Sequence, residues 1–213
     1  MEIRAVGPFF KNGFVVACED TREAVLIDPG DEVGELLAFA KQQSLVIRYI
    51  LLTHAHVDHI SGVAEAKRAL AAPIYLHRDD LFLYERLVEM GAMFGMKVAP
   101  APSVDAFYAP RQTIQFGALE AVPHHTPGHC PGGVCLEIRQ RGTIGKDLFV
   151  GDTLFAGSIG RTDLPGGDLP TLLASIRNVL FAFGDDARVH PGHGPSTTIG
   201  QERRTNPFLL GAV

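Results

Sequence analysis

The sequence predicts an α/β protein in which mixed sheets are flanked by helices. Segments with strand-like apolar runs alternate with segments in which apolar residues recur every three or four positions. Two strand-like segments near the start are joined by a short polar turn, which is typical of an antiparallel hairpin. Several later strand-like segments follow one another without a helix between them. Because parallel neighbours need a crossover and antiparallel neighbours do not, we expect both kinds of strand pairing.

The first elements are expected in the order strand, strand, helix, strand. Residues 13–18 and 23–28 form the hairpin strands. Residues 33–41 show the apolar spacing of an amphipathic helix. Residues 46–52 are largely apolar, and we expect this strand to be buried on both faces.

The middle of the chain is predicted to hold two helices, a short strand and a loop. The helices cover residues 61–70 and 79–90, the second with Asp79 as its N-cap, and the strand covers 74–77. Residues 91–112 contain three prolines that interrupt any regular element. This segment is expected to be either a loop or a lid near a site.

The last third is predicted to contain a run of strands, a helix and a final strand. Strands are expected at 119–123, 133–138 and 148–150. A helix follows Pro170 and extends over 171–183, and the last strand covers 187–190.

The composition of the chain excludes several classes of protein. The 213 residues are 46% hydrophobic, with 23 glycines and 14 prolines, which excludes a coiled coil, a collagen-like fibre and a disordered tail. No linker divides residues 1–213, so we expect a single domain. The three cysteines are an odd number in a chain too long to need disulfides, which favours free thiols in a reducing compartment.

The charge pattern argues against nucleic acid and membrane partners. The formal net charge is −5, and no run of basic residues is longer than two. No apolar run approaches the ~18 residues that a membrane span needs, and the first residues do not form a signal-peptide pattern. We therefore expect a cytoplasmic protein that acts on a small molecule, in an oligomeric state that the sequence leaves open.

Candidate metal ligands are concentrated in one segment. His54, His56, Asp58 and His59 lie within six residues, directly after an apolar strand. Residues two apart in an extended segment point the same way, so His54 and His56 can bind one ion while Asp58 and His59 face a second. A solvated polar loop is the alternative, but four ligand-type residues at a buried strand end have no packing reason.

Further candidates occur singly at turns and strand ends. His129, Asp152 and His193 each lie in a glycine-containing turn that can direct a side chain at a fixed point. Asp28 is either a hydrogen-bond partner of a ligand histidine or a turn residue. The remaining isolated histidines are expected to be structural: His77, His124, His125 and His190.

Four motifs together resemble those of the metallo-β-lactamase superfamily. They are HAHVDH at 54–59, HTPGH at 125–129, GDTLF at 151–155 and PGHGP at 191–195. The resemblance extends from about residue 13 to residue 208. It implies an αββα sandwich of two mixed sheets flanked by helices.

Two more motifs resemble the glyoxalase II branch, also called hydroxyacylglutathione hydrolase. They are GRTD at 160–163 and TNPF at 205–208. Longer members of that branch continue into a helical domain that binds glutathione, whereas this chain ends at residue 213, so we expect that domain to be absent. Arg161 matches a position where the branch places a basic residue near the substrate, and it is a candidate substrate-binding residue.

The resemblance implies two divalent metal ions, zinc first, with iron or manganese as alternatives. One ion would be bound by His54, His56 and His129, and the second by Asp58, His59 and His193, with Asp152 bridging both.

The implied reaction is thioester hydrolysis by a metal-bridging hydroxide that Asp58 orients, with a 2-hydroxyacylglutathione such as lactoylglutathione as the substrate. The alternatives within the superfamily are a persulfide dioxygenase with one iron and, with less support, a lactonase. A metal-stabilised interaction module without activity would be favoured by a missing ligand, and all seven positions match.

Overall fold

The computed structural model describes residues 2–6 and 10–210, with side chains from residue 10 onward. Its internal contacts divide the chain into two compact units. The first contains the described residues up to Tyr108 together with Gln115–Ala118, and the second contains Ala109–Ile114 and the described residues from Leu119 onward.

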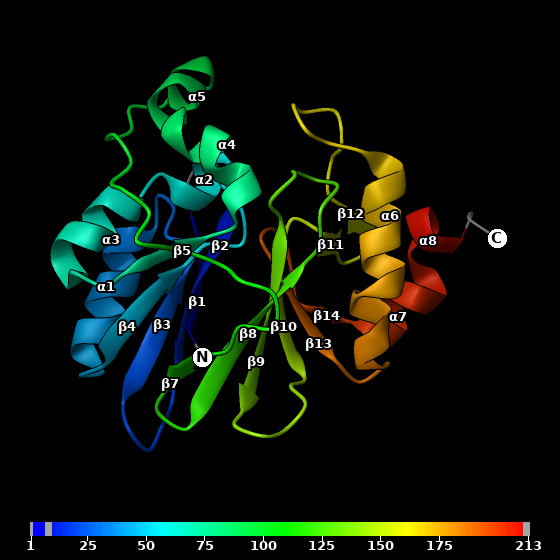
Figure 1. The fold of residues 1–213 in the computed structure, drawn as a ribbon, viewed down its shortest axis with the longest axis horizontal. Helices are drawn as coiled ribbons and strands as arrows, with labels where there is room; N and C mark the ends of the chain where they lie inside the picture. The colour runs from blue at the N-terminus through cyan, green and yellow to red at the C-terminus, as the bar shows by residue number, and fades with distance from the viewer. Residues whose placement is uncertain (1, 7–9, 211–213) are drawn as a thin grey trace. The chain divides into compact units, whose positions relative to one another are not determined.

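The first unit is built on a six-stranded mixed sheet in which the strands follow one another in chain order (Figure 1). The first three strands pair antiparallel and the last four pair parallel, so the third strand has one neighbour of each kind. The strands are β1 (Glu2–Val6), β2 (Lys11–Ala17), β3 (Glu23–Ile27), β4 (Val46–Leu51), β5 (Ile74–Leu76) and β6 (Ala106–Phe107).

Two helices, α1 (Val33–Gln42) and α3 (Val63–Leu70), lie against one face of this sheet (Figure 1). Each buries a stripe of apolar side chains, as amphipathic helices do. Shorter helical segments complete the unit: α2 (Val57–Ile60), η1 (Arg78–Asp80), α4 (Leu81–Glu85) and α5 (Leu87–Met93).

The second sheet also has six strands and is mixed. Its order is β14-β13-β10-β9-β8-β7, and β10 and β13 pair parallel while β8, β9 and β10 pair antiparallel. The strands are β7 (Ile114–Phe116), β8 (Leu119–His125), β9 (Val134–Gln140), β10 (Asp147–Gly151), β13 (Arg188–Pro191) and β14 (Thr197–Thr198). A separate two-stranded hairpin is formed by β11 (Leu154–Phe155) and β12 (Ser158–Ile159).

The helices of the second unit pack on this sheet through an apolar core. Leu172 and Ile176 of α6 (Leu169–Asn178) belong to the same buried cluster as Leu148 and Val189 of the sheet. Three more helical segments follow: η2 (Leu180–Phe183), α7 (Ile199–Thr205) and α8 (Pro207–Leu210). Among the described residues, no helix has the length and apolar character to cross a membrane.

Most expected elements are present, and several differ in their details. The helix expected after Pro170 over 171–183 begins at Leu169, contains Pro170 and ends at Asn178, and the 3₁₀ helix η2 follows it. The helix expected at 79–90 is divided into the three segments η1, α4 and α5. The N-cap of the first segment is His77, whose Nδ1 accepts a hydrogen bond from the Asp79 amide at 3.3 Å. Asp79 is therefore not the N-cap. The helix expected from residue 61 begins at Val63, because a one-turn helix precedes it.

The strand expected at 46–52 is buried on both faces only in its second half. Val46 is 53% exposed and Arg48 is also exposed, whereas Ile50 and Leu51 are fully buried. The segment expected at 91–112 to be loop or lid begins with the last residues of α5 and contains the short strand β6. All three cysteines are buried free thiols, as their number predicts.

Candidate metal centre

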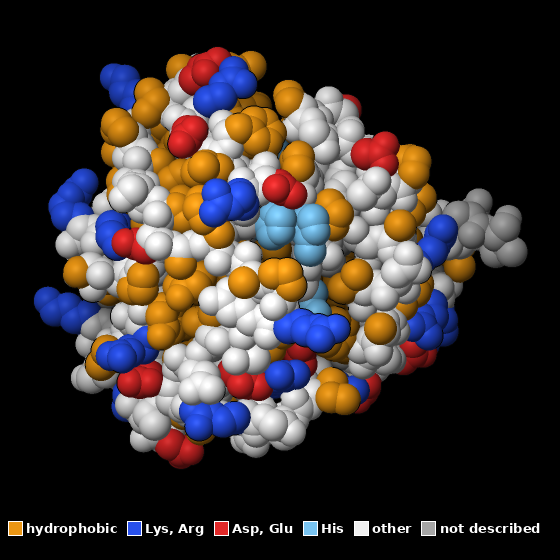
Figure 2. Space-filling view, viewed as in Figure 1, with side chains coloured by type: hydrophobic (Ala, Val, Ile, Leu, Met, Phe, Trp, Pro, Cys, Tyr) orange, Lys and Arg blue, Asp and Glu red, His pale blue; other side chains and the backbone are white. Residues whose placement is uncertain are grey.

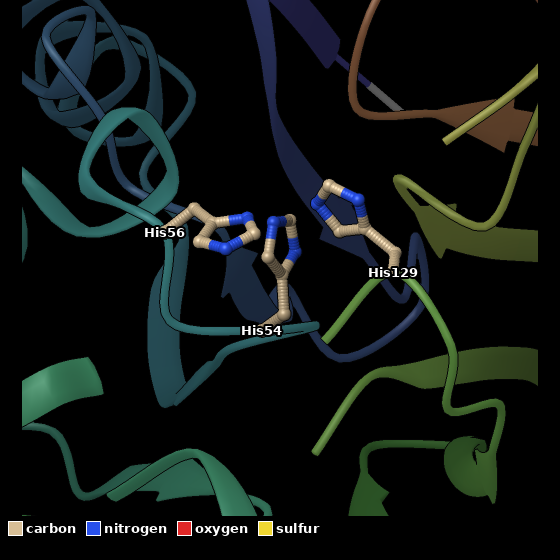
Figure 3. Close-up of side chains that lie close together, drawn as sticks. All are labelled: His54, His56 and His129. Atoms are coloured by element: carbon tan, nitrogen blue, oxygen red, sulfur yellow. The ribbon is translucent and has the colours of Figure 1, made fainter. Parts of the chain in front are cut away.

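The first unit places a histidine loop at the end of a buried strand. The backbone leaves β4 at Leu51 and enters α2 at Val57, and the intervening loop carries His54 and His56. Their ring centroids lie 4.9 Å apart with the ring planes perpendicular. Figure 3 shows the two rings projecting from this one loop, and it also labels His129, which comes from the turn after β8.

Asp28 forms hydrogen bonds with Thr53, at the start of the histidine loop, and with His59. Its Oδ1 accepts a hydrogen bond from the Thr53 amide at 2.7 Å, and its Oδ2 lies 2.9 Å from Nδ1 of His59. Oδ2 also accepts from the Thr53 hydroxyl at 2.5 Å. Asp28 is thus the hydrogen-bond partner of a candidate ligand, rather than a turn residue only.

The Asp28 contact determines which nitrogen of His59 can bind a metal. A carboxylate at Nδ1 keeps the proton there, so the lone pair is on Nε2. The Nε2 atom lies 3.8 Å from Oδ2 of Asp58, and the ring of His59 is 4.0 Å from that of His54 between centroids. His59 therefore lies beside both Asp58 and His54.

A second buried carboxylate supports the same loop, and the sequence analysis missed it. Asp80 is fully buried, and its Oδ2 accepts a hydrogen bond from the Ala55 amide at 3.0 Å. Ala55 lies between the two candidate ligands His54 and His56. The sequence signals Asp80 only as part of an acidic pair after a short strand, a pattern that predicts a helix cap.

The second unit brings its three candidates together around Asp152. Nε2 of His129 lies 3.6 Å from Oδ2 of Asp152, and Nε2 of His193 lies 3.5 Å from the same oxygen. Two ligand atoms that share a tetrahedral metal ion are about 3.3 Å apart when the bonds are about 2.0–2.1 Å. The spacing fits shared ligation of a cation.

Two glycines allow this arrangement. Gly128, beside His129, has φ of +127°, and a Cβ on it would overlap the backbone nitrogen of Leu172 at the start of α6. A Cβ on Gly160 would overlap the carbonyl oxygen of Asp152. Any larger residue would therefore displace His129 or Asp152.

Arg161 contributes to the second unit through its backbone. Its carbonyl oxygen lies 2.8 Å from Nδ1 of His129 and directs Nε2 of that ring toward Asp152. Its guanidinium is exposed and forms two hydrogen bonds of 2.7 Å with Asp163. These hydrogen bonds to Arg161 lower the pKa of Asp163 to about 2.

The isolated histidines have protein partners that suit structural roles. Nε2 of His190 lies 2.9 Å from Asp147 and its Nδ1 lies 3.0 Å from the Ser196 hydroxyl. Nε2 of His124 lies 2.9 Å from Glu137, and Nε2 of His125 lies 2.8 Å from the Pro131 carbonyl. Nδ1 of His77 accepts the hydrogen bond from the Asp79 amide. Histidine side chains also reach the surface, as the pale-blue patch in Figure 2 shows.

The donor chemistry of both units fits divalent metal ions. All candidate ligand atoms are imidazole nitrogens or carboxylate oxygens, which suit zinc, iron and manganese. Nδ1 of His54 lies 3.1 Å from the Thr53 hydroxyl, so His54, His59 and His129 each have a protein partner at Nδ1. Such partners are typical of metal-binding histidines.

Comparison with known proteins decides the family. Residues 6–197 match the family model of the metallo-beta-lactamase superfamily. The chain belongs to this superfamily. Two of the similar proteins, GloC of Haemophilus influenzae and YqgX of Bacillus subtilis, are named as a hydrolase and a probable metallo-hydrolase. The resemblance drawn from the motifs is confirmed at the level of the superfamily.

Several known proteins are similar to this chain over nearly its whole length. The hydroxyacylglutathione hydrolase GloC of Haemophilus influenzae is 38% identical over 216 residues, which are 98% of this chain and 97% of GloC. The crystal structure of the BLEG-1 B3 metallo-beta-lactamase is 38% identical with a TM-score of 0.88, covering 99% of both chains. The structure of TTHA1623 in a di-iron-bound form is 40% identical with a TM-score of 0.85, covering 98% of this chain and 100% of that one.

These comparisons confirm the predicted fold class. The two mixed sheets with flanking helices correspond to the metallo-β-lactamase fold. The protein is therefore a metallo-hydrolase of this superfamily, with histidine clusters suited to metal.

Proposed function

We propose that this protein is a metal-dependent thioesterase that hydrolyses a 2-hydroxyacylglutathione such as lactoylglutathione. The observation that carries the proposal is the similarity to GloC, which bears the name hydroxyacylglutathione hydrolase and matches over 98% of this chain. The TNPF motif at 205–208 supports the same branch, and the PGHGP motif at 191–195 favours a hydrolase over the persulfide dioxygenase, which resembles this chain at GRTD. The chain would act on a small-molecule thioester, without nucleic acid or membrane partners.

The metal sites proposed for this activity use seven residues. One ion would be held by His54, His56 and His129, the other by Asp58, His59 and His193, and Asp152 would serve both. The contacts of Asp152 with His129 and His193, at 3.6 and 3.5 Å, support this assignment. Zinc is the first choice of metal, and the di-iron-bound form of TTHA1623 supports iron as the alternative, with manganese also suited to the ligands.

The ions would supply the nucleophile, because divalent metals lower the pKa of a bound water to about 7 and polarise a carbonyl oxygen. The chain's own residues would orient the reactants. Asp58 is mostly buried, 3.8 Å from Nε2 of His59, and can accept a hydrogen bond from the attacking water. Asp28 and the Arg161 carbonyl would hold the rings of His59 and His129 in the required tautomer.

A thioester suits this set of residues chemically. The departing thiolate has a pKa of about 8.5, so it leaves without a strong general acid. Hydrolysis of a β-lactam is the second candidate, favoured by the similarity to BLEG-1. An amide nitrogen leaves with more difficulty and needs a proton donor, so we rank the thioester first. A cytoplasmic location is proposed from the three free thiols.

The test is thiol release from lactoylglutathione by zinc-loaded protein under anaerobic conditions. We expect one thiol per lactate formed. The Asp58→Asn variant should lose at least ~100-fold in kcat, whereas the control Asp31→Asn, which changes an exposed carboxylate bonded to Ser61, should keep wild-type activity.

Two results would overturn the proposal. Oxygen uptake with glutathione persulfide, without anaerobic thioester cleavage, would assign the protein as a persulfide dioxygenase. Cleavage of a cephalosporin but not of the thioester would assign it as a β-lactamase. The same set of substrates should include a lactone, which tests the weaker alternative of a lactonase.

A further inference from the structure

A lysine and a glutamate form a buried ion pair next to the backbone of Asp28. Lys11, the first residue of β2, and Glu32, just before α1, are each 1% exposed. Nζ of Lys11 lies 2.6 Å from Oε1 of Glu32, which also accepts a hydrogen bond from the Gly30 amide at 3.1 Å. Charged side chains are almost never fully buried unless they are paired, so this pair needs a reason.

The ammonium group of Lys11 also donates to the backbone carbonyl of Asp28. Asp28 has φ of +49°, in the left-handed region that non-glycine residues rarely adopt. A backbone held in such a conformation persists only when its surroundings fix it. The carboxylate of the same residue contacts His59, so the Lys11 contact fixes the group that orients a candidate ligand.

The turn that follows Asp28 links the ion pair to Asp58. A Cβ on Gly30 would lie 2.7 Å from Cε of Lys11 and would overlap the carbonyl oxygen of Asp58. The turn is therefore in close contact with Lys11 on one side and with Asp58 on the other. Glu32 fits beside β2 only because Gly13 has no side chain, since a Cβ there would overlap Oε1 of Glu32.

We propose that Lys11 is a positioning residue for the candidate ligands Asp58 and His59. Its ammonium group, held by Glu32, fixes the backbone of Asp28, and Asp28 in turn fixes His59 and the turn against Asp58. In this series of contacts, Lys11 acts on the proposed ligands through Asp28 and the turn that follows it. The inference rests on the proposed function only in taking Asp58 and His59 as metal ligands, and it is independent of the substrate.

The test measures zinc affinity by competition with a chelator, together with the thermal midpoint of unfolding. Lys11→Met keeps an unbranched side chain, one atom shorter, and removes the ammonium group with its charge. We expect one of the two zinc equivalents to bind ~10–100-fold less tightly, which is the usual effect of losing a hydrogen-bond partner that orients a metal ligand. Glu32→Gln keeps a side-chain oxygen that can accept the hydrogen bond from Lys11, so the contact between Lys11 and the Asp28 carbonyl stays in place. The zinc affinity of this variant should therefore change less than ~3-fold.

The double variant Lys11→Met/Glu32→Gln separates positioning from stability. It leaves no unpaired buried charge, so its thermal midpoint should recover relative to Lys11→Met. Its zinc affinity should stay low, because the Asp28 carbonyl still lacks its donor. This variant also carries the test if Lys11→Met alone does not fold.

Arg139→Met is the matched control in the second unit. Arg139 donates to Glu120 at 2.7 Å, and the variant should lower the thermal midpoint while both zinc equivalents bind as in the wild type. Wild-type zinc affinity in Lys11→Met, or recovery of affinity together with stability in the double variant, would overturn the inference. Failure of thioester cleavage alongside the expected affinity loss would overturn the proposed substrate and leave this inference standing.

Discussion

His59 Nδ1 lies 2.9 Å from Oδ2 of Asp28, although 31 residues separate them in the sequence. Both side chains are fully buried. Asp28 follows β3, and His59 lies on the helix that follows β4, the parallel neighbour of β3. Parallel neighbouring strands end at the same edge of a sheet. The fold therefore places the Asp28 carboxylate next to Nδ1 of the candidate ligand His59 at that edge.

Asp28→Asn should weaken metal binding by ~10–100-fold, because an amide replaces the carboxylate that keeps the proton of His59 on Nδ1. The measurement is zinc competition with a chelator. Asp31→Asn changes an exposed carboxylate three residues away and should leave zinc binding unchanged. Equal affinities of Asp28→Asn and the wild type would show that His59 does not need this partner.

Asp147 should stabilise the fold in a pH-dependent way. Burial opposes ionisation of Asp147, but hydrogen bonds from His190 and Arg188 outweigh it and lower the pKa of the carboxyl from 3.8 to about 2. A pKa lowered by folding means that the ionised group contributes stability above pH ~4, and that this contribution is lost as the pH falls toward ~2.

The measurement for Asp147 is urea unfolding of the wild type and Asp147→Asn between pH 7 and pH 3. Because the side chain is 28% exposed, solvent screening reduces the effect, and we expect a difference of roughly 1 kcal/mol at pH 7. The difference should shrink below pH 4. A difference that stays constant down to pH 3 would contradict the assigned shift.

Arg161→Ala should leave metal content unchanged, because the contact with His129 uses the backbone carbonyl, which alanine retains. If the guanidinium contributes uniform binding to the substrate, KM for lactoylglutathione should rise more than kcat falls. Steady-state kinetics with metal analysis of the same sample tests both parts. A loss of bound metal would show that the side chain, and not the carbonyl, supports His129.

The fold class and the longer elements could be predicted because their signals are local. The helix α1 and the strands β8 and β9 depend on apolar periodicity within each segment. The short strands β6 and β14 have two residues each and form only by pairing with strands that the chain reaches elsewhere. A two-residue segment carries no period of its own.

The candidate ligands could be predicted for the same reason, since most lie in compact motifs. Their supporting residues could not. Asp80 reaches the Ala55 amide from 25 residues away, and nothing in its local sequence indicates that contact. Lys11 was not predicted because lysine is normally exposed, and only the fold shows that Glu32 compensates its burial.

The most direct test of the central claim is the number of metal ions per chain. Metal analysis of protein purified without chelator should find close to two ions in the wild type and in His190→Ala, since His190 forms hydrogen bonds with Asp147 and Ser196 and is not one of the seven proposed ligands. Asp152→Ala should lose most of the metal, because a ligand of both ions is removed. One ion per chain under metal-replete conditions, or full occupancy in Asp152→Ala, would contradict the dinuclear account.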